Sequence, residues 1–412
     1  MLERFFEAPF TLERLRSGPS GGYVDGFADQ LGGDGYSRET GRTYLRSASH
    51  VGWFAESKGE ALSAATVGTL NAYAQHFGQC RCPHGYRGRR QEAVRGAKLF
   101  LGHLARIDVA KEWTEAGEAE EAPLVASFRC WLVQHRGSGE STVYHYCRGA
   151  GDLIATLGDD PATYNAGNLR TFILEQARQS GPGAAKSLIS AVRAFLRYLA
   201  AVGACRVGLD GAIPSIAGWR LASQPRSLGK DDVERTLGAC DTETVVGLRD
   251  RTVILLLARL GLRAGDVAGL RFSDFDWDDG SLVVAGKSRR EARLPLPQEV
   301  GDALLSYIEC RPLSEEERVF LRVLPPFRPL PSRSISQIVG RAMRRAGVIA
   351  TSYGSHILRH SAATEMLREG ASLYEVGAVL RHRSCDQTAY YAKVDFTLLK
   401  LVAQPWPEVL GC

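Results

Sequence analysis

The chain has 412 residues, more than one ordinary domain needs, so two to four domains are expected. Its hydrophobic content of 44% supports well-formed cores, and its net charge of +5 permits a nucleic-acid partner without demanding one. Nine scattered cysteines, an odd number, argue against a disulfide framework and for a reducing compartment.

The N-terminal stretch "MLERFFEAPFTLERL" lacks the layout of a signal peptide, and the longest apolar run, Val253–Ala258, is too short to span a bilayer. We therefore expect a cytoplasmic protein. Two stretches, "EWTEAGEAEEAPL" and "IPSIAGWRLASQPRSLGKDD", have compositions typical of linkers. They divide the chain into three predicted domains, residues 1–115, 122–212 and 226–412.

The first two predicted domains resemble each other. Segments that begin at Phe27 and Phe128 each contain an apolar helix, a glycine-containing break, a Ser/Thr cap and a second helix with tyrosine near its start. A basic-aromatic helix follows in both. This pattern predicts an internal duplication of about 100 residues, although two unrelated short helical bundles would look similar.

Within the second of these segments, apolar residues recur at helical spacing from Leu188 to Leu199, with Arg193 and Arg197 interleaved. A basic face on a small helical bundle suits a phosphate backbone, although a solvated face is the commoner meaning of such charges. We predict that Arg193 and Arg197 contact DNA.

The third predicted domain is mixed. Helices are expected over 231–240 and 248–262, and then "DWDDGSLVVAGKSRREARLPLP" breaks the helical period. Its segments "SLVV" and "ARLPLP" predict two short strands that form a β-hairpin with a polar basic turn. Helical patterns return after the hairpin and continue to the tail.

Two histidines and an arginine are concentrated in "HILRH" of this third domain. His356, Arg359 and His360 lie at i, i+3 and i+4, so on a helix they share one face. Three potential cations on one face repel one another unless a negative group is nearby, which could be a carboxylate cluster, a metal-bound anion or a phosphate.

Other local signals accompany this one: Arg263 in "LGLRAGDVAGLRFSDFDW", Lys287 in the hairpin turn, and His382 shortly before the pair Tyr390 and Tyr391. Each alone is weak. Their order, Arg, Lys in a β-turn, His-x-x-Arg, His and Tyr, resembles that of the tyrosine site-specific recombinases, the phage-integrase family, across about 226–395. The phrases "GKSRREARLPLP" and "HILRHSAATEMLREG" resemble the family's conserved boxes closely.

The resemblance implies a multidomain, mainly α fold. Duplicated N-terminal helical (SAM-like) bundles would precede a mixed α+β catalytic domain with a small β-sheet. Residues 1–115 would then be an N-terminal DNA-binding domain, 122–212 a core-binding domain, and 226–412 the catalytic domain with its tail. The implied activity is a transposon- or genomic-island-type integrase that cleaves and rejoins double-stranded DNA.

The resemblance also implies roles for the catalytic residues. Two arginines would clamp the scissile phosphate, a tyrosine would form a covalent 3′-phosphotyrosine, and a lysine would protonate the leaving 5′-oxygen. One histidine would be the base and another a donor to the phosphate, with no metal, ATP or other cofactor. The two clamping arginines would be Arg263 and Arg359, the nucleophile Tyr391 and the proton donor Lys287. His356 would be the base, and His382 would donate a hydrogen bond to the phosphate.

Four further positions lie beside these predicted catalytic residues. Arg381 precedes His382 where the family usually has glycine, and it would either contact phosphate or face solvent. Asp266, where many relatives have glutamate, would order the turn at Arg263. His360 is interpreted as structural, through packing or a supporting hydrogen bond. Tyr390 is an alternative nucleophile, disfavoured by its spacing from His382.

Two further clusters have ambiguous meaning. His76, Cys80, Cys82 and His84 are residue types that suit zinc, but Cys-x-Cys is not the usual zinc spacing, and a loop that touches DNA backbone is the commoner interpretation. We therefore predict no metal site. A basic helix end is predicted to contact DNA, although it could be a solvated face; it contains Arg341, Arg344 and Arg345.

The tail after Tyr391 contains an apolar stripe over 398–402. In relatives such a helix docks onto a neighbouring protomer, which implies a synaptic tetramer on DNA, formed with itself or with sister recombinases; docking onto the chain's own catalytic domain is the alternative. Two other functions stay open: a type IB-like topoisomerase, which reseals without exchange, and a non-catalytic DNA-binding regulator.

Overall fold

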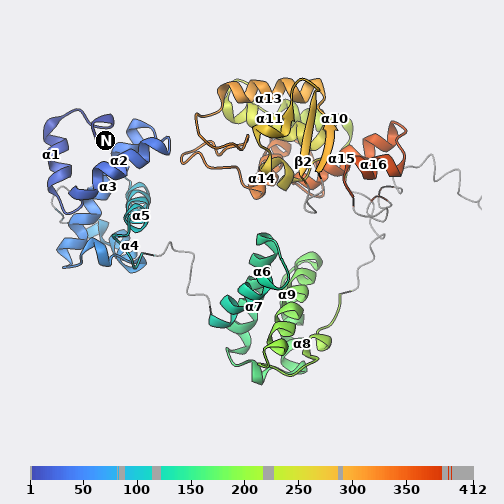
Figure 1. Cartoon of the computed structure of the whole chain (residues 1–412), viewed down its shortest axis with the longest axis horizontal. Helices are drawn as coiled ribbons and strands as arrows, with labels where there is room; N and C mark the ends of the chain where they lie inside the picture. The colour runs from blue at the N-terminus through green and yellow to red at the C-terminus, as the bar shows by residue number, and fades with distance from the viewer. Residues whose placement is uncertain are drawn as a thin grey trace, which may run out of the picture. The chain divides into compact units, whose positions relative to one another are not determined.

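The computed structural model describes residues 2–80, 82, 89–113, 122–216, 227–285, 291–382, 388 and 391 (Figure 1). The chain divides into two compact units. One comprises Met1–Leu62, Tyr73–His103 and Arg220–Cys412, and the other Ser63–Ala72 and Leu104–Trp219. Among the described residues, no helix has both the length and the apolar character needed to cross a membrane.

The first part of the chain is helical, as predicted. Ser37 begins its longest helix by accepting a hydrogen bond from the Thr40 backbone N–H. The rings of Phe27 and Phe100 meet edge to face, 5.3 Å apart, in the interior. The helices are α1 (Pro9–Ser17), α2 (Gly21–Gly33), α3 (Arg38–Ser57), α4 (Val67–Gln75) and α5 (Arg90–Arg106), with 3-10 turns at Leu2–Arg4, Leu62–Ala64 and His76–Gln79.

The second helical part has the predicted succession of an apolar helix, a glycine-containing break, a long second helix and a late basic-aromatic helix. Phe128, Phe172 and Phe195 are buried in its core. Asn165 starts the third helix with a reciprocal capping box. The helices are α6 (Pro123–Gln134), α7 (Glu140–Leu157), α8 (Ala166–Gln179) and α9 (Pro182–Ala201), with 3-10 turns at Pro161–Thr163 and Leu209–Ala212.

The third part combines helices with a small antiparallel sheet of order β1-β2-β3. The predicted hairpin is confirmed: β2 pairs with β3, and Leu282 lies opposite Leu294. The elements are α10 (Lys230–Gly238), α11 (Val245–Arg259), α12 (Ala264–Gly269), β1 (Phe275–Asp276), β2 (Ser281–Ala285), β3 (Glu291–Pro295), α13 (Gln298–Cys310), α14 (Ser332–Arg345), α15 (Ser355–Arg368) and α16 (Leu373–Val379), with a 3-10 turn at Phe272–Asp274.

Helix α11 is the centre of this third part. Its run Val253–Ala258 is buried and packs in one core with the sheet and with α13, α14 and α15. The buried pair Arg249 and Asp250 also belongs to α11, and the Arg249 guanidinium donates to the Leu321 carbonyl oxygen at 3.1 Å. This helix therefore fixes the segments from which the candidate active-site residues project.

Candidate active site

Arg263 lies at the turn between α11 and α12. The chain passes through Gly261 with φ of +59°, a conformation that favours glycine. The Arg263 backbone N–H then donates to the Asp266 carboxylate at 3.0 Å, so Asp266 orders this turn, in agreement with the sequence interpretation. The Arg263 guanidinium donates to the Arg381 carbonyl oxygen at 3.2 Å.

Arg359, on α15, is almost fully buried, with 5% of its surface exposed. Its guanidinium donates to the carbonyl oxygens of Gly261 and Leu380, which joins α15 to the segments on either side of the site. Burial, and then the positive charge of Arg263, lowers the pKa of Arg359 to about 10. Arg359 is therefore still a cation at neutral pH.

Three histidines accompany these arginines, and all are biased toward their neutral form. Burial, followed by the charges of Arg359 and Arg263, lowers the pKa of His356. Burial is also the main cause that lowers the pKa of His360 and of His382 to about 4 each. At neutral pH these imidazoles are therefore uncharged, so each has one ring nitrogen that can accept a hydrogen bond.

Tyr391 is buried among these groups, with 3% of its surface exposed. Its ring lies parallel to that of His382, with centroids 6.2 Å apart. Its hydroxyl lies 2.6 Å from Nδ1 of His360. The supporting role predicted for His360 is thus a direct hydrogen bond to the proposed nucleophile, a partner that the sequence pattern did not identify.

Arg381 belongs to the same cluster. It has φ of +54°, the left-handed conformation that the family's usual glycine would adopt easily, and its side chain is only 10% exposed. It forms an ion pair with Asp266, so the expectation that it might face solvent is wrong: the carboxylate draws the guanidinium inward. Its Nε and Nη1 are buried without a hydrogen-bond partner among the described residues.

The structure does not place the remaining predicted residues in this cluster. Lys287, Tyr390, His84 and the tail stripe at 398–402 lie outside the described residues. Arg193 donates to the Ile213 carbonyl oxygen at 2.8 Å, and Arg197 pairs with Asp210 at 2.7 Å, so both engage their own bundle. The three basic residues at the end of α14 are exposed: Arg341, Arg344 and Arg345.

The arrangement suits a reaction at a phosphodiester. The charges of Arg263 and, less strongly, Arg381 lower the pKa of Arg359, whereas Tyr391 raises it, so these four side chains lie close enough to interact electrostatically. Guanidiniums bind phosphate oxygens through paired donors, and an anion among them would relieve their mutual repulsion. A phenol with an ordinary pKa near 10 needs a base, and a neutral histidine is within hydrogen-bond distance of it.

Comparisons with known proteins identify relatives of this chain. The model of the phage integrase family matches residues 226–397. A Sinorhizobium fredii protein named as an integrase/recombinase, y4rA, is 34% identical, over 98% of this chain and 99% of the relative. The tyrosine recombinase XerD of Listeria monocytogenes is 28% identical, over 67% of this chain and 96% of the XerD chain.

The fold is also that of a solved recombinase. The structure of the XerH site-specific recombinase bound to a palindromic difH substrate matches with a TM-score of 0.55. The match has 18% sequence identity and covers 69% of this chain and 85% of that one. The chain belongs to the phage integrase family, the tyrosine recombinases.

Proposed function

We propose that this chain is a site-specific DNA recombinase that integrates, excises or transposes a mobile element through a covalent 3′-phosphotyrosine. Its membership of the tyrosine recombinases supports this activity. The observation that carries the proposal is the buried Tyr391 hydroxyl in a cluster with two arginine clamps, Arg263 and Arg359. The two arginines can bind a phosphate anion, and the Tyr391 hydroxyl can act as the nucleophile that attacks it.

In the proposed reaction, the Tyr391 oxygen attacks phosphorus while the bond from phosphorus to the 5′-oxygen breaks. The phenol proton passes to a histidine, and the leaving oxygen receives a proton from Lys287. Arg263 and Arg359 bind the non-bridging oxygens, where negative charge increases in the transition state; each such donor contributes on the order of a hundred- to a thousandfold in rate. The phosphotyrosine retains the bond energy, so resealing needs neither metal nor ATP.

Two neutral histidines are candidates for the group that accepts the phenol proton of Tyr391. His356 is the base that the family resemblance assigns, and burial keeps it neutral. His360 is also neutral and is already hydrogen-bonded to the Tyr391 hydroxyl. We therefore assign to His360 the task of holding the phenol in the DNA-free enzyme, and to His356 that of removing its proton once DNA is bound; His382 donates to the phosphate.

Arg381 adds a third cation to this arrangement. Its ion pair with Asp266 satisfies one guanidinium nitrogen, while two other nitrogens remain buried without a described partner. A buried donor without a partner is costly, and a phosphate oxygen would satisfy it. We propose that Arg381 either contacts the scissile phosphate directly or holds Arg263 through the carbonyl oxygen that Arg263 binds.

Binding to double-stranded DNA is assigned to exposed basic residues as well. Arg341, Arg344 and Arg345 project from the end of α14 into solvent, where they would bind the backbone. Arg193 and Arg197 are each bonded within their bundle, yet an arginine has five donors and retains some for phosphate. Because strand exchange needs four active sites, we propose a synaptic tetramer in the cytoplasm, alone or with sister recombinases.

The direct test is trapping of the covalent intermediate. The target site is first located by footprinting on the DNA that flanks the gene. A suicide substrate with a nick beside the scissile phosphate then loses its short 5′-hydroxyl fragment, so the adduct accumulates on a denaturing gel. A band shift is expected for the wild-type chain and not for Tyr391→Phe, with Tyr390→Phe as the matched control.

The outcomes also separate the alternatives. A non-catalytic regulator would bind the site but form no adduct. A type IB-like topoisomerase would form the adduct and relax supercoiled DNA without joining two sites. A recombinase is expected to produce recombinant junctions from two target sites, detected by amplification across them, and their absence despite adduct formation would overturn strand exchange.

A further inference from the structure

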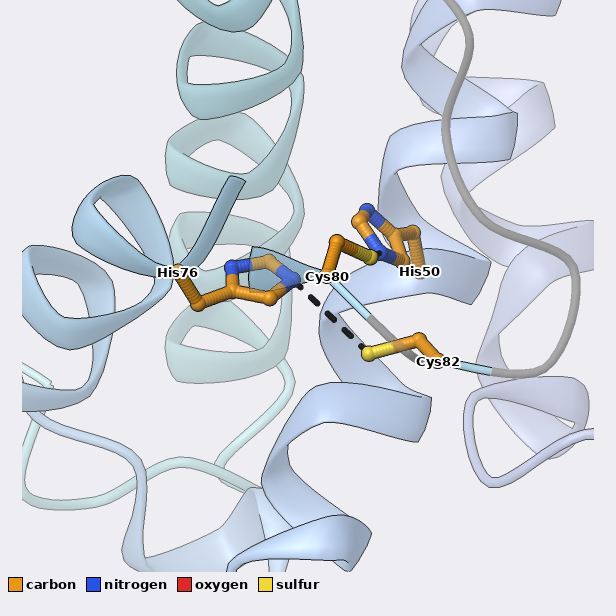
Figure 2. A group of neighbouring side chains, drawn as sticks. All are labelled: His50, His76, Cys80 and Cys82. Carbon is orange, nitrogen blue, oxygen red and sulfur yellow. Dashed lines mark hydrogen bonds between the residues drawn. The ribbon is translucent and has the colours of Figure 1, made fainter. Parts of the chain in front are cut away.

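A second cluster of chemically active side chains lies in the N-terminal helical part. His50 comes from α3, His76 from the 3-10 turn after α4, and Cys80 and Cys82 from the segment that follows (Figure 2). The candidate ligand atoms of these four residues all lie within 4.8 Å of one another. None of the four takes part in the phosphodiester chemistry proposed above.

The distances between these atoms fit one tetrahedral ion. His50 Nε2 lies 3.2 Å from Cys80 Sγ, and His76 Nε2 lies 3.7 Å from Cys82 Sγ. Zinc bonds of about 2.0 Å to nitrogen and 2.3 Å to sulfur place neighbouring ligand atoms roughly 3.5 Å apart in a tetrahedron. Each histidine–cysteine pair therefore has the separation of one edge of such a site.

The outward nitrogen of each imidazole is also held. His50 Nδ1 lies 3.0 Å from the hydroxyl of Tyr73, and His76 Nδ1 lies 2.5 Å from the backbone oxygen of the same residue. Tyr73 itself is fully buried. Hydrogen bonds of this kind fix the ring orientation and leave Nε2 available as the ligand, which is the usual arrangement around metal-binding histidines.

We propose that His50, His76, Cys80 and Cys82 form a structural zinc site. Two thiolates and two neutral imidazoles balance the charge of Zn²⁺, and sulfur ligands exclude magnesium and calcium. With four protein ligands the site is closed, so it stabilises the fold and leaves no position for a substrate. The ion would join α3 to the segment that precedes the exposed Arg89 and Arg90.

The sequence spacing predicts no metal site, because the Cys-x-Cys of His76, Cys80, Cys82 and His84, which lie within nine residues, is not the usual zinc pattern. In the fold, His50, a buried residue of a helix far upstream, lies beside His76, Cys80 and Cys82. A lone histidine on an apolar helix face gives no spacing signal. The two ligand sets make opposite predictions for His50→Gln and His84→Gln.

The first experiment measures the metal in the full-length chain, purified without a histidine tag. Mass spectrometric elemental analysis is expected to find about one zinc per chain. Cobalt introduced in its place should show the intense visible bands of tetrahedral Co²⁺ and the near-ultraviolet thiolate charge-transfer band. Metal-free protein that takes up neither zinc nor cobalt would overturn the proposal, and so would octahedral, thiolate-free cobalt spectra.

Variants then identify the ligands. His50→Gln and Cys80→Ser are expected to lose stoichiometric zinc, whereas the exposed residues changed in His145→Gln and Cys130→Ser should retain it. Loss of zinc in His84→Gln with retention in His50→Gln would refute the ligand set. Because these variants could fail to fold, circular dichroism accompanies them, and the wild-type cobalt spectrum decides independently.

A milder change tests the surrounding hydrogen bonds. Tyr73→Phe removes the hydroxyl that contacts His50 and keeps the backbone oxygen that contacts His76. Zinc affinity, measured by competition with a chromophoric chelator, is expected to fall about tenfold while the stoichiometry is unchanged. An unchanged affinity would mean that Tyr73 does not orient a metal ligand.

Discussion

Arg359 combines two tasks that both need a guanidinium. Its donors to the carbonyl oxygens of Gly261 and Leu380 hold the site together, and its charge is available to a phosphate. Lysine offers a point charge with a different geometry and cannot span both carbonyls and an anion. Loss of Arg359 is therefore expected to affect chemistry more than DNA binding.

The change Arg359→Ala should lower the rate of covalent adduct formation at least about a hundredfold, since a preorganised cation contributes that much to transition-state stabilisation. DNA affinity, measured by mobility shift, should change little because many other phosphate contacts carry it. Arg368→Ala, at an exposed position of the same helix, is the matched control. If a folded Arg359→Ala chain formed the adduct at the wild-type rate, Arg359 would not bind the scissile phosphate as proposed.

His360 gives a prediction about pH. Burial holds its pKa at about 4, below the 6.5 of an unfolded chain, so between these values the unfolded state binds more protons. The free energy of unfolding of the DNA-free protein should therefore fall as pH drops from about 6.5 toward 4. A histidine NMR titration, assigned with His360→Asn, should show a midpoint near 4, and a midpoint near 6.5 would contradict the buried hydrogen bond to Tyr391.

At the scale of elements, the turn between α11 and α12 sets the geometry of the site. Gly261 has a positive φ, its carbonyl oxygen holds Arg359, and Arg263 follows two residues later. A Cβ at Gly261 would lie 2.5 Å from Cδ2 of Leu380. An added side chain would therefore displace the buried Leu380 side chain, in the residue whose carbonyl oxygen binds Arg359.

Gly261→Ala is expected to lower both the melting temperature and the rate of adduct formation. Gly280→Ala separates backbone strain from the clash, because Gly280 has the same φ of +59° and nothing within 4 Å of an added Cβ. Strain alone costs about 1–2 kcal/mol, so Gly280→Ala should be destabilised by roughly that amount with normal adduct formation. Equal catalytic loss in both variants would show that the Leu380 contact is unimportant.

The elements whose pattern is local in sequence could be predicted, whereas contacts between distant residues could not. Helical periodicity and the polar turn predicted the helices and the β2–β3 hairpin, because both patterns are local. Strand β1 was missed because two residues have no detectable period. The contact of His360 with Tyr391, the inward Arg381 and the approach of His50 to Cys80 depend on residues distant in sequence, which a linear motif does not specify.

At the scale of the whole molecule, strand exchange requires several chains to act on one DNA junction. The resemblance to the family implies that the apolar stripe at 398–402 of one protomer docks onto its neighbour. Pairing of active sites would then depend on the tail.

Removal of residues 398–412 is expected to leave DNA binding and the formation of adduct on an isolated site, while synaptic tetramers disappear. Light scattering on the two-site complex measures the assembly. The alternative, self-docking of the tail, predicts that truncation lowers the melting temperature of the monomer. Tetramers formed normally by the truncated chain would contradict a role in assembly.

Tyr391 is expected to become covalently bonded to DNA phosphorus within the Arg263 and Arg359 cluster. The most direct measurement is mass spectrometric mapping of the peptide that carries the nucleotide after nuclease and protease digestion of the trapped adduct. We expect a 3′-phosphonucleotide on the oxygen of Tyr391. A nucleotide on Tyr390 or any other residue, or adduct formation by Tyr391→Phe, would contradict it.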